Sequence, residues 1–234
     1  VGLALVEAKQ LVLPIFLSTD LAFRNMQRYS LFGDPATRLA VPRLEVELAV
    51  ADSLNALGEV TVAGRVLDST GKHANDYQGR VWLQAFDSSE RSRLEGFNYR
   101  QIGSHIFRGR FPVVDGRFSA TFRVPKDITY GGTDGRISGY VWSDSSPSAF
   151  GSVDRLRLSG TAAGVETDVT GPQISLRFEG ADGSSIPSQS VLRATITDPS
   201  GINITGETGH EIELAIDGEL HILTDFYSVL GGDY

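Results

Sequence analysis

The period of the hydrophobic pattern changes near residue 43. Before this point, residues 2–11 are rich in strong helix formers, with small or apolar residues at helical spacing, which predicts a first helix. A second helix is predicted over residues 18–29, with Ser18 or Thr19 as its N-terminal cap. The pattern therefore predicts a short helical segment, residues 1–42, ahead of a longer β-rich part.

Both helices would expose an apolar face if they stood alone. We therefore expect them to pack on other parts of the protein or on a second copy of the chain. The apolar run at residues 11–17 is shorter than the roughly 20 residues of a membrane helix, and it contains Pro14. We expect a buried element there and no transmembrane segment.

From Leu44 onward, apolar and polar residues alternate. In residues 117–124 every second residue is apolar and is predicted to face the core, namely Phe118, Ala120, Phe122 and Val124. Such alternation is typical of an antiparallel strand with one buried face. The dipeptide Asp115-Gly116 just before it predicts a two-residue hairpin turn, because both central residues of such a turn need positive φ.

Residues 43–164 carry enough predicted strands for an Ig-like antiparallel β-sandwich. The strands are expected at residues 45–50, 60–66, 80–86, 107–114, 117–124, 136–142 and 154–158. Trp82 and Trp142 are the candidate core aromatics. The expected fold class is mainly β, preceded by a short helical remnant.

Residues 160–171 are small and polar, which predicts a linker between domains. A further domain is expected at residues 165–234, with strands at residues 174–178, 192–196, 212–216 and 219–223. These strands are too few for a full sandwich, so a partial second β-sandwich is predicted. Its open edge would be covered by a neighbouring chain or by strands beyond Tyr234.

Composition excludes several classes of function. The chain has 29 acidic and 21 basic residues, and its net charge of −8 disfavours nucleic-acid binding. It has no cysteine, so it has neither a disulfide framework nor a thiol nucleophile. No basic region precedes an apolar one at the start of the sequence, so no signal peptide is visible.

The histidines show no spacing typical of a metal or catalytic site. We expect His73 to be solvated, His105 and His221 to lie within strands, and His210 to bond a turn. We therefore assign no catalytic, cofactor-binding or metal-binding residue.

Other side chains leave two ligand classes open. Asp144, Asp182 and Asp198 lie in predicted loops, where carboxylates either bind calcium or cap turns. No cofactor is expected, with calcium as the alternative. Four aromatic side chains could either form a platform that binds a sugar or a peptide, or pack in the core or an interface: Phe97, Tyr99, Tyr130 and Phe150.

Four motifs resemble one family of enzymes. The run Tyr29–Leu39 (YSLFGDPATRL) is similar to the last element of the gingipain-type cysteine peptidase domain. Residues 124–130, 168–174 and 198–212 resemble the region that follows the peptidase domain in PorU-type members, the sortases of the type IX secretion system. Together the motifs span most of the chain.

The resemblance implies a fold and a function. In this family a caspase-like α/β domain passes directly into Ig-like sandwiches, so residues 1–42 would be the end of a peptidase domain. The catalytic Cys–His pair would lie before Val1, and this part would be inactive alone. The parent would be a bacterial cysteine endopeptidase at the cell surface or outer membrane, where it performs proteolysis and protein sorting.

The implied partners are the upstream catalytic domain and the protein substrates of the parent. The helical remnant and the open sheet edge make self-association a further candidate. The alternative function is a non-enzymatic extracellular adhesion or carbohydrate-binding β-sandwich module. The sequence preceding Val1 discriminates between the two, because the peptidase needs a His and a Cys there.

Overall fold

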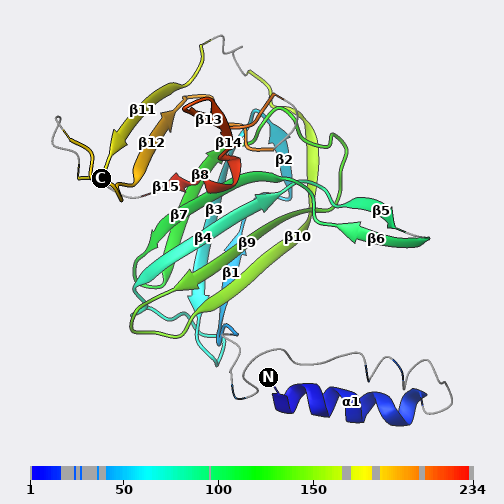
Figure 1. Cartoon of the computed structure of the whole chain (residues 1–234). Helices are drawn as coiled ribbons and strands as arrows, with labels where there is room; N and C mark the ends of the chain where they lie inside the picture. Colours follow the sequence, from blue (N-terminus) through cyan, green and yellow to red (C-terminus); the bar gives the residue numbers. More distant parts are fainter. Residues whose placement is uncertain are drawn as a thin grey trace. The chain divides into compact units, whose positions relative to one another are not determined.

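The computed structural model (Figure 1) describes residues 2–16, 24, 27, 36, 41–94, 96–164, 170–180, 185–205 and 209–231. The chain divides into two compact units between Val41 and Pro42. The regular elements described in the second unit are strands and one 3₁₀ turn, so the predicted mainly β fold class is confirmed. No helix of the described residues is long and apolar enough to cross a membrane.

Helix α1 spans Gly2–Phe16 and extends beyond the predicted end at residue 11. It passes through Pro14, which lacks the N–H of a helical hydrogen bond; the helix ends two residues later. Of the predicted second helix, only Arg24 and Gln27 are described, both with helical backbone. The Tyr29–Leu39 run lies outside the described residues, except for Ala36.

The main sheet has the strand order β15-β7-β4-β9-β10-β1-β3-β8, with β2 paired to β10. The bounds are β1 Leu44–Ala49, β2 Ser53–Ala56, β3 Glu59–Leu67, β4 Gly79–Phe86, β7 His105–Val113, β8 Arg117–Arg123, β9 Gly135–Trp142, β10 Ala149–Thr161 and β15 Val229–Leu230. Most neighbours are antiparallel, as predicted. The pairs β1–β10, β2–β10 and β7–β15 are parallel, which the sequence pattern did not predict.

Strand β10 reaches several partners because its register shifts along its length. It pairs with β9 up to Val153 and resumes at Leu156. Between these residues Arg155 has a φ of 64°, a conformation that fits a bulge rather than a regular strand. The bend lets the first part of β10 pair with β1 and the last part pair with β2.

The core follows the predicted alternation. Val60, Val62 and Val66 of β3 are buried, and so are Phe118, Ala120 and Phe122 of β8. The two tryptophans were predicted wrongly as core residues. Trp82 and Trp142 are only half-buried, because in β4 the buried Val81 and Leu83 occupy the opposite face from Trp82. Trp82 instead lies against the Arg110 guanidinium, 5.0 Å from its ring centroid.

Strands β5 (Glu90–Leu94) and β6 (Phe97–Gln101) pair with each other and with no further strand of the described residues. They form a hairpin that projects away from the main sheet (Figure 1). Most of their side chains are exposed. The sequence did not predict this hairpin, because neither strand has the alternating apolar face that packs on a core.

Residues 170–231 form two small sheets and then return to the main one. Strands β11 (Gln173–Phe178) and β12 (Leu192–Thr197) pair with each other, as do β13 (Glu213–Ile216) and β14 (Glu219–Ile222). After a 3₁₀ turn, η1 (Thr224–Phe226), β15 joins the edge of β7. A partial second sandwich at residues 165–234, with its boundary near 164, stays a prediction.

Candidate functional site

Strands β7 and β8 diverge from a tight turn and create an opening in the β-structure. Asp115 and Gly116 both have positive φ, 50° and 67°, so the predicted hairpin turn is confirmed. Val114 and Arg117 bridge the two strands at the turn. Beyond it, β7 pairs with β4 while β8 pairs with β3. The two strands are therefore hairpin neighbours in sequence but belong to different parts of the main sheet.

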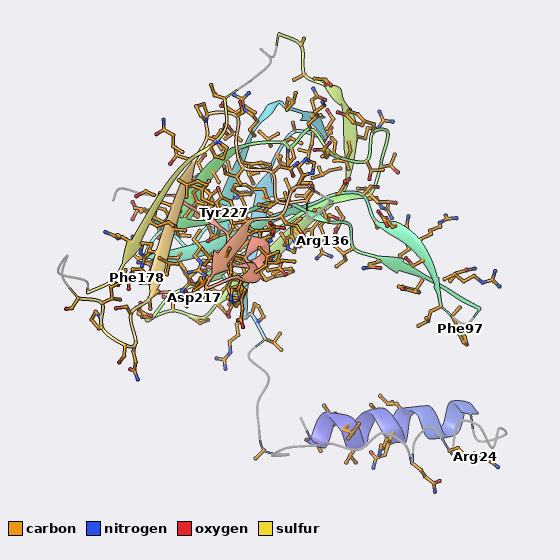
Figure 2. The ribbon with its side chains drawn as sticks, turned by 45° about the horizontal axis from the view of Figure 1, so that its top comes forward. Arg24, Phe97, Arg136, Phe178, Asp217 and Tyr227 are labelled. Atoms are coloured by element: carbon orange, nitrogen blue, oxygen red, sulfur yellow. The ribbon has the colours of Figure 1, made fainter. Side chains whose placement is uncertain are left out.

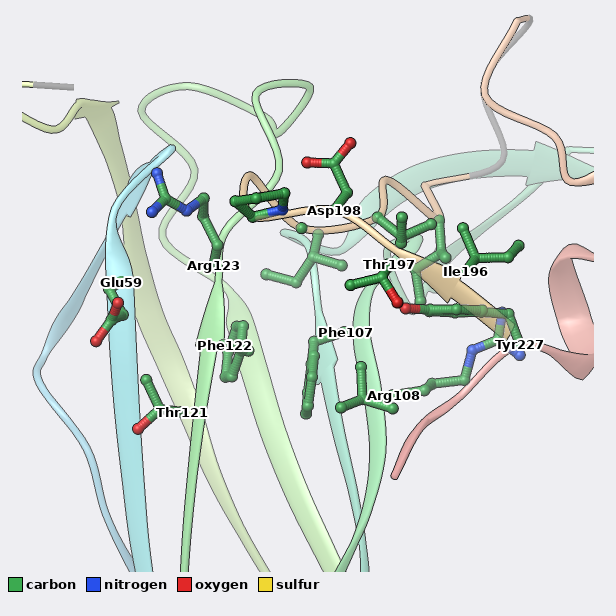
Figure 3. A pocket seen from close by; sticks show the side chains of 16 residues that line it. Glu59, Phe107, Arg108, Thr121, Phe122, Arg123, Ile196, Thr197, Asp198 and Tyr227 are labelled. Carbon is green, nitrogen blue, oxygen red and sulfur yellow. The ribbon is translucent and has the colours of Figure 1, made fainter. Parts of the chain in front are cut away.

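The far end of this opening is filled from both sides by aromatic rings. Phe107 of β7 and Phe122 of β8 stack with ring centroids 4.2 Å apart and an interplanar angle of 11°. Figure 3 shows the two rings facing each other. The pair lets the diverging strands share one apolar core at the place where no backbone ladder joins them.

A cavity of about 310 Å³ lies above this aromatic pair (Figure 3). Its walls come from β3, β7 and β8, and from the C-terminal part of the chain. The apolar lining consists of Ile106, Phe107, Phe122, Ile196, Pro199, Ile202, Ile204 and Val229. Polar side chains of both signs line it as well, namely Glu59, Arg108, Arg123 and Asp198. The cavity is thus a mainly apolar groove without a strong charge of one sign.

Arg108 is the most unusual side chain of this groove, because it is charged and only 6% exposed. Its Nη1 donates to the Asp225 carbonyl oxygen over 2.8 Å, and Nη2 donates to the Thr224 carbonyl oxygen over 3.1 Å. Its Nε is buried and has no hydrogen-bond partner among the residues that the structure describes. A buried N–H without an acceptor costs free energy, so this donor is an exception to the usual pairing of buried polar groups.

The sequence contained one sign of this arrangement. In β7 the core-facing residues include Phe107 and Phe111, so Ile106 and Arg108 lie on the opposite face, and both are nevertheless buried. Ile106 is an apolar residue at a position where alternation predicts a polar one. It indicated a second covering layer over β7, which the turn η1 provides through its bonds to Arg108.

Two titratable groups near the groove are shifted by burial. Burial lowers the pKa of His105 below its usual 6.5; Arg108 lowers it further, and the carboxylate of Asp225 raises it. Burial also raises the pKa of Tyr227 above its usual 10.0. Both shifts favour the neutral forms of the imidazole and the phenol.

The remaining histidines have different surroundings. His73 is half-buried rather than solvated, because it packs beneath the turn at Gly116. Its buried Nε2 has no hydrogen-bond partner in the described part of the chain. His210 Nε2 lies 3.5 Å from a carboxylate oxygen of Asp127, which fits a structural role. His221 is exposed in β14, and His105 lies in β7, as predicted.

The carboxylates considered for calcium are dispersed. Asp198 accepts a hydrogen bond from the Ser200 N–H over 2.7 Å and so caps its own turn. Asp144 follows β9, and Asp182 lies outside the described residues. Across the described part of the chain, no three His, Asp or Glu side chains are grouped as a metal site would need. Calcium binding stays a prediction.

Two exposed surfaces lie outside the groove. Phe97 is 80% exposed at the end of the β5–β6 hairpin (Figure 2), and Tyr99 is exposed on the same strand. Tyr130 and Phe150 are also exposed but lie elsewhere, in a loop and in β10. The β11–β12 hairpin pairs apolar residues across one face, at Ile174–Ile196, Leu176–Ala194 and Phe178–Leu192. This apolar face of β11–β12 carries exposed Ile174, Leu176 and Phe178.

No family model matches the chain, and no curated protein matches it. Among solved structures, the crystal structure of dimeric latent PorU from Porphyromonas gingivalis is similar, with 28% identity and a TM-score of 0.54. The similarity covers 94% of this chain and 23% of that one. The sporulation control protein Spo0M from Bacillus subtilis is 16% identical with a TM-score of 0.33, over 52% of this chain and 51% of that one. The expected PorU-like relationship is thus confirmed, and it extends over almost the whole chain.

Proposed function

We propose that this chain is the C-terminal, non-catalytic part of a secreted, gingipain-like cysteine peptidase of the PorU type. One observation carries the proposal: the chain matches PorU over 94% of its own length while covering 23% of the PorU chain. The motifs in residues 124–130, 168–174 and 198–212 support the same assignment. The parent would act in proteolysis and protein sorting at the bacterial cell surface or outer membrane.

In this proposal the β-rich part braces an upstream catalytic domain and binds partners. The chain has no cysteine, so it has no thiol for the nucleophilic step of a cysteine peptidase. In this proposal the chain therefore stabilises the catalytic domain and binds its partners. The protein substrates of the parent would be brought to the catalytic domain by surfaces of this part.

The test compares the parent protein with a variant that lacks residues 43–234. We expect the deletion to lower the melting temperature of the catalytic domain and its activity on protein substrates. A thiol reagent should abolish the parent's activity, and the 234-residue chain alone should hydrolyse no peptide. If the sequence before Val1 held further alternating strands instead of a His and a Cys, and the chain bound glycans, the adhesion or carbohydrate-binding alternative would replace this proposal.

We also propose self-association as a partner mode of this part, through the apolar face of β11–β12. Leu176 is 55% exposed on that face, while Arg177 is exposed on the opposite face. Sedimentation velocity should show weaker association for Leu176→Ser than for the matched neighbour Arg177→Ser. Equal sedimentation of both variants and the unchanged chain at all concentrations would remove this surface from consideration.

Calcium remains a proposed ligand of the loop carboxylates. An ion that binds the folded state stabilises it by an amount that grows with the logarithm of the ratio of ion concentration to Kd, and the melting temperature rises accordingly. Melting curves with calcium and with a chelator test this directly. Identical curves at millimolar calcium would contradict the proposal.

A further inference from the structure

The opening between β7 and β8 presents unpaired backbone groups along β8. Val124 N donates to the Gly58 carbonyl oxygen, so the backbone N–H and C=O groups of the even-numbered residues of β8 point toward β3. On the other edge of β8, Arg117 exchanges backbone hydrogen bonds with Val114. Since strand positions alternate, Ser119, Thr121 and Arg123 direct their N–H and C=O groups away from β3. These three residues carry no other backbone ladder in the described part of the chain, because β8 ends the strand order.

The edge of β7 that does not pair with β4 is covered over part of its length by the extended strand β15. Gly231 N donates to the Arg110 carbonyl oxygen over 2.7 Å, which places β15 on the outer edge of β7. Among the described residues, strand β15 pairs with Gly109 and Arg110 of β7. The opening therefore accepts an extended backbone, and its own strand covers only a short part of it.

The cavity adds side-chain recognition to these edges. It is bounded by Thr121–Arg123 of β8 and by Ile106–Arg108 of β7, so both free edges run along it. Its volume of about 310 Å³ lies at the lower end of ligand sites and suits one or two apolar side chains.

We propose that this groove binds an extended segment of another polypeptide by strand addition to β8. The segment pairs with the N–H and C=O groups of Ser119 and Thr121, and it places an apolar side chain against Phe107 and Phe122. Main-chain pairing supplies the affinity in such complexes and the pocket supplies the selectivity.

The charges of the groove favour this occupant. Glu59 and Asp198 are offset by Arg123 and Arg108, so the lining suits neither a phosphate nor a strongly acidic ligand. A peptide with alternating apolar and hydroxyl side chains matches a surface of this kind. The inference rests on the groove itself and does not depend on the proposed link to a peptidase.

The probe is a fluorescein-labelled, acetylated heptapeptide, Thr-Val-Thr-Phe-Thr-Val-Thr amide, titrated into the full chain and followed by anisotropy. We expect saturable binding below about 1 mM, and N-methylation of alternate peptide amides should weaken it about tenfold or more. Amide NMR shifts should concentrate at residues 105–108 and 119–123. Absence of saturation, equal binding of the N-methylated peptide, or shifts located elsewhere would each overturn the proposal.

A pair of variants tests the β8 edge. Thr121→Pro removes the N–H that points away from β3 and leaves the β3 ladder intact, whereas Thr121→Ala keeps this N–H. Both variants lose the side-chain hydrogen bond to Thr61, so they are matched in that respect. We expect about tenfold weaker peptide binding for the proline variant and less than about twofold for the alanine variant. Equal affinities of these two variants would contradict strand addition at β8.

Discussion

The guanidinium of Arg108 donates to the Thr224 carbonyl oxygen over 3.1 Å, and this bond joins residues 116 positions apart. It fastens the turn η1 onto the outer face of β7, together with the bond to the Asp225 carbonyl oxygen. The strand β15, which follows η1, then adds to the edge of β7. The C-terminal part of the chain is thereby held over the opening between β7 and β8.

Replacing Arg108 by methionine should destabilise the protein by about 2–4 kcal/mol, because the buried Thr224 carbonyl oxygen and the partly buried Asp225 carbonyl oxygen lose a charged donor. Chemical denaturation measures the loss in the free energy of unfolding. Hydrogen exchange should show the largest loss of protection at residues 224–231. Arg110→Met is the matched control, since Arg110 is exposed two positions away and lies over Trp82; its effect should stay within about 1 kcal/mol. Similar losses for both variants would refute this role of Arg108.

The Phe107–Phe122 stack should be a second determinant of stability. Phe122 is 6% exposed, and its truncation to alanine leaves a cavity where β7 and β8 have no ladder between them. We expect a loss of about 3–5 kcal/mol in denaturant unfolding. Phe97→Ala removes a ring that is 80% exposed and should change stability by less than about 0.5 kcal/mol. A small effect of Phe122→Ala would show that the core closes without the stack.

His105 should make stability depend on pH. Its folded pKa lies below the usual 6.5, mainly through burial, so the unfolded chain binds the proton more readily. The contribution of His105 to the free energy of unfolding should therefore be constant above the usual pKa of 6.5 and fall as the pH drops below 6.5. Protonation also costs the bond in which neutral His105 Nε2 accepts from the Gln84 amide over 2.9 Å.

The measurement is the free energy of unfolding of the chain and of His105→Gln between about pH 7.5 and about pH 5.5. The advantage of the unchanged chain over the variant should shrink toward the lower pH. His221→Gln is the control, because it removes an exposed histidine without touching β7. A constant difference between the chain and His105→Gln would contradict the shifted pKa.

The turn at Gly116 should tolerate no side chain. Its φ is +67°, and an added Cβ would press on the Ala74 carbonyl oxygen and lie 2.9 Å from His73 Nε2. Gly71 has a φ of +80° with nothing within 4 Å, so Gly71→Ala isolates the cost of the backbone conformation. We expect about 1 kcal/mol for Gly71→Ala and at least about 1 kcal/mol more for Gly116→Ala in thermal or denaturant unfolding. Equal costs would mean that the Ala74 and His73 contacts relax freely.

The strands that sequence reasoning located are those with a clear alternation and a buried face. Residues 117–124 are an example, since Phe118, Ala120 and Phe122 are buried as predicted. Strand β5 and strand β6 were missed because their exposed side chains carry no periodic signal. Strand β15 was missed because a two-residue strand is defined by its partner rather than by its own sequence.

The mainly β class, the Asp115-Gly116 turn and the core faces of the central strands follow from the sequence, because alternation and turn chemistry are local properties. The separation of β7 and β8, the covering of β7 by η1 and the burial of Arg108 arise from tertiary contacts. These features depend on contacts between residues more than a hundred positions apart, as in the Arg108–Thr224 bond. No local pattern encodes which distant carbonyl oxygen a buried guanidinium will contact, so the groove could not be predicted from the sequence.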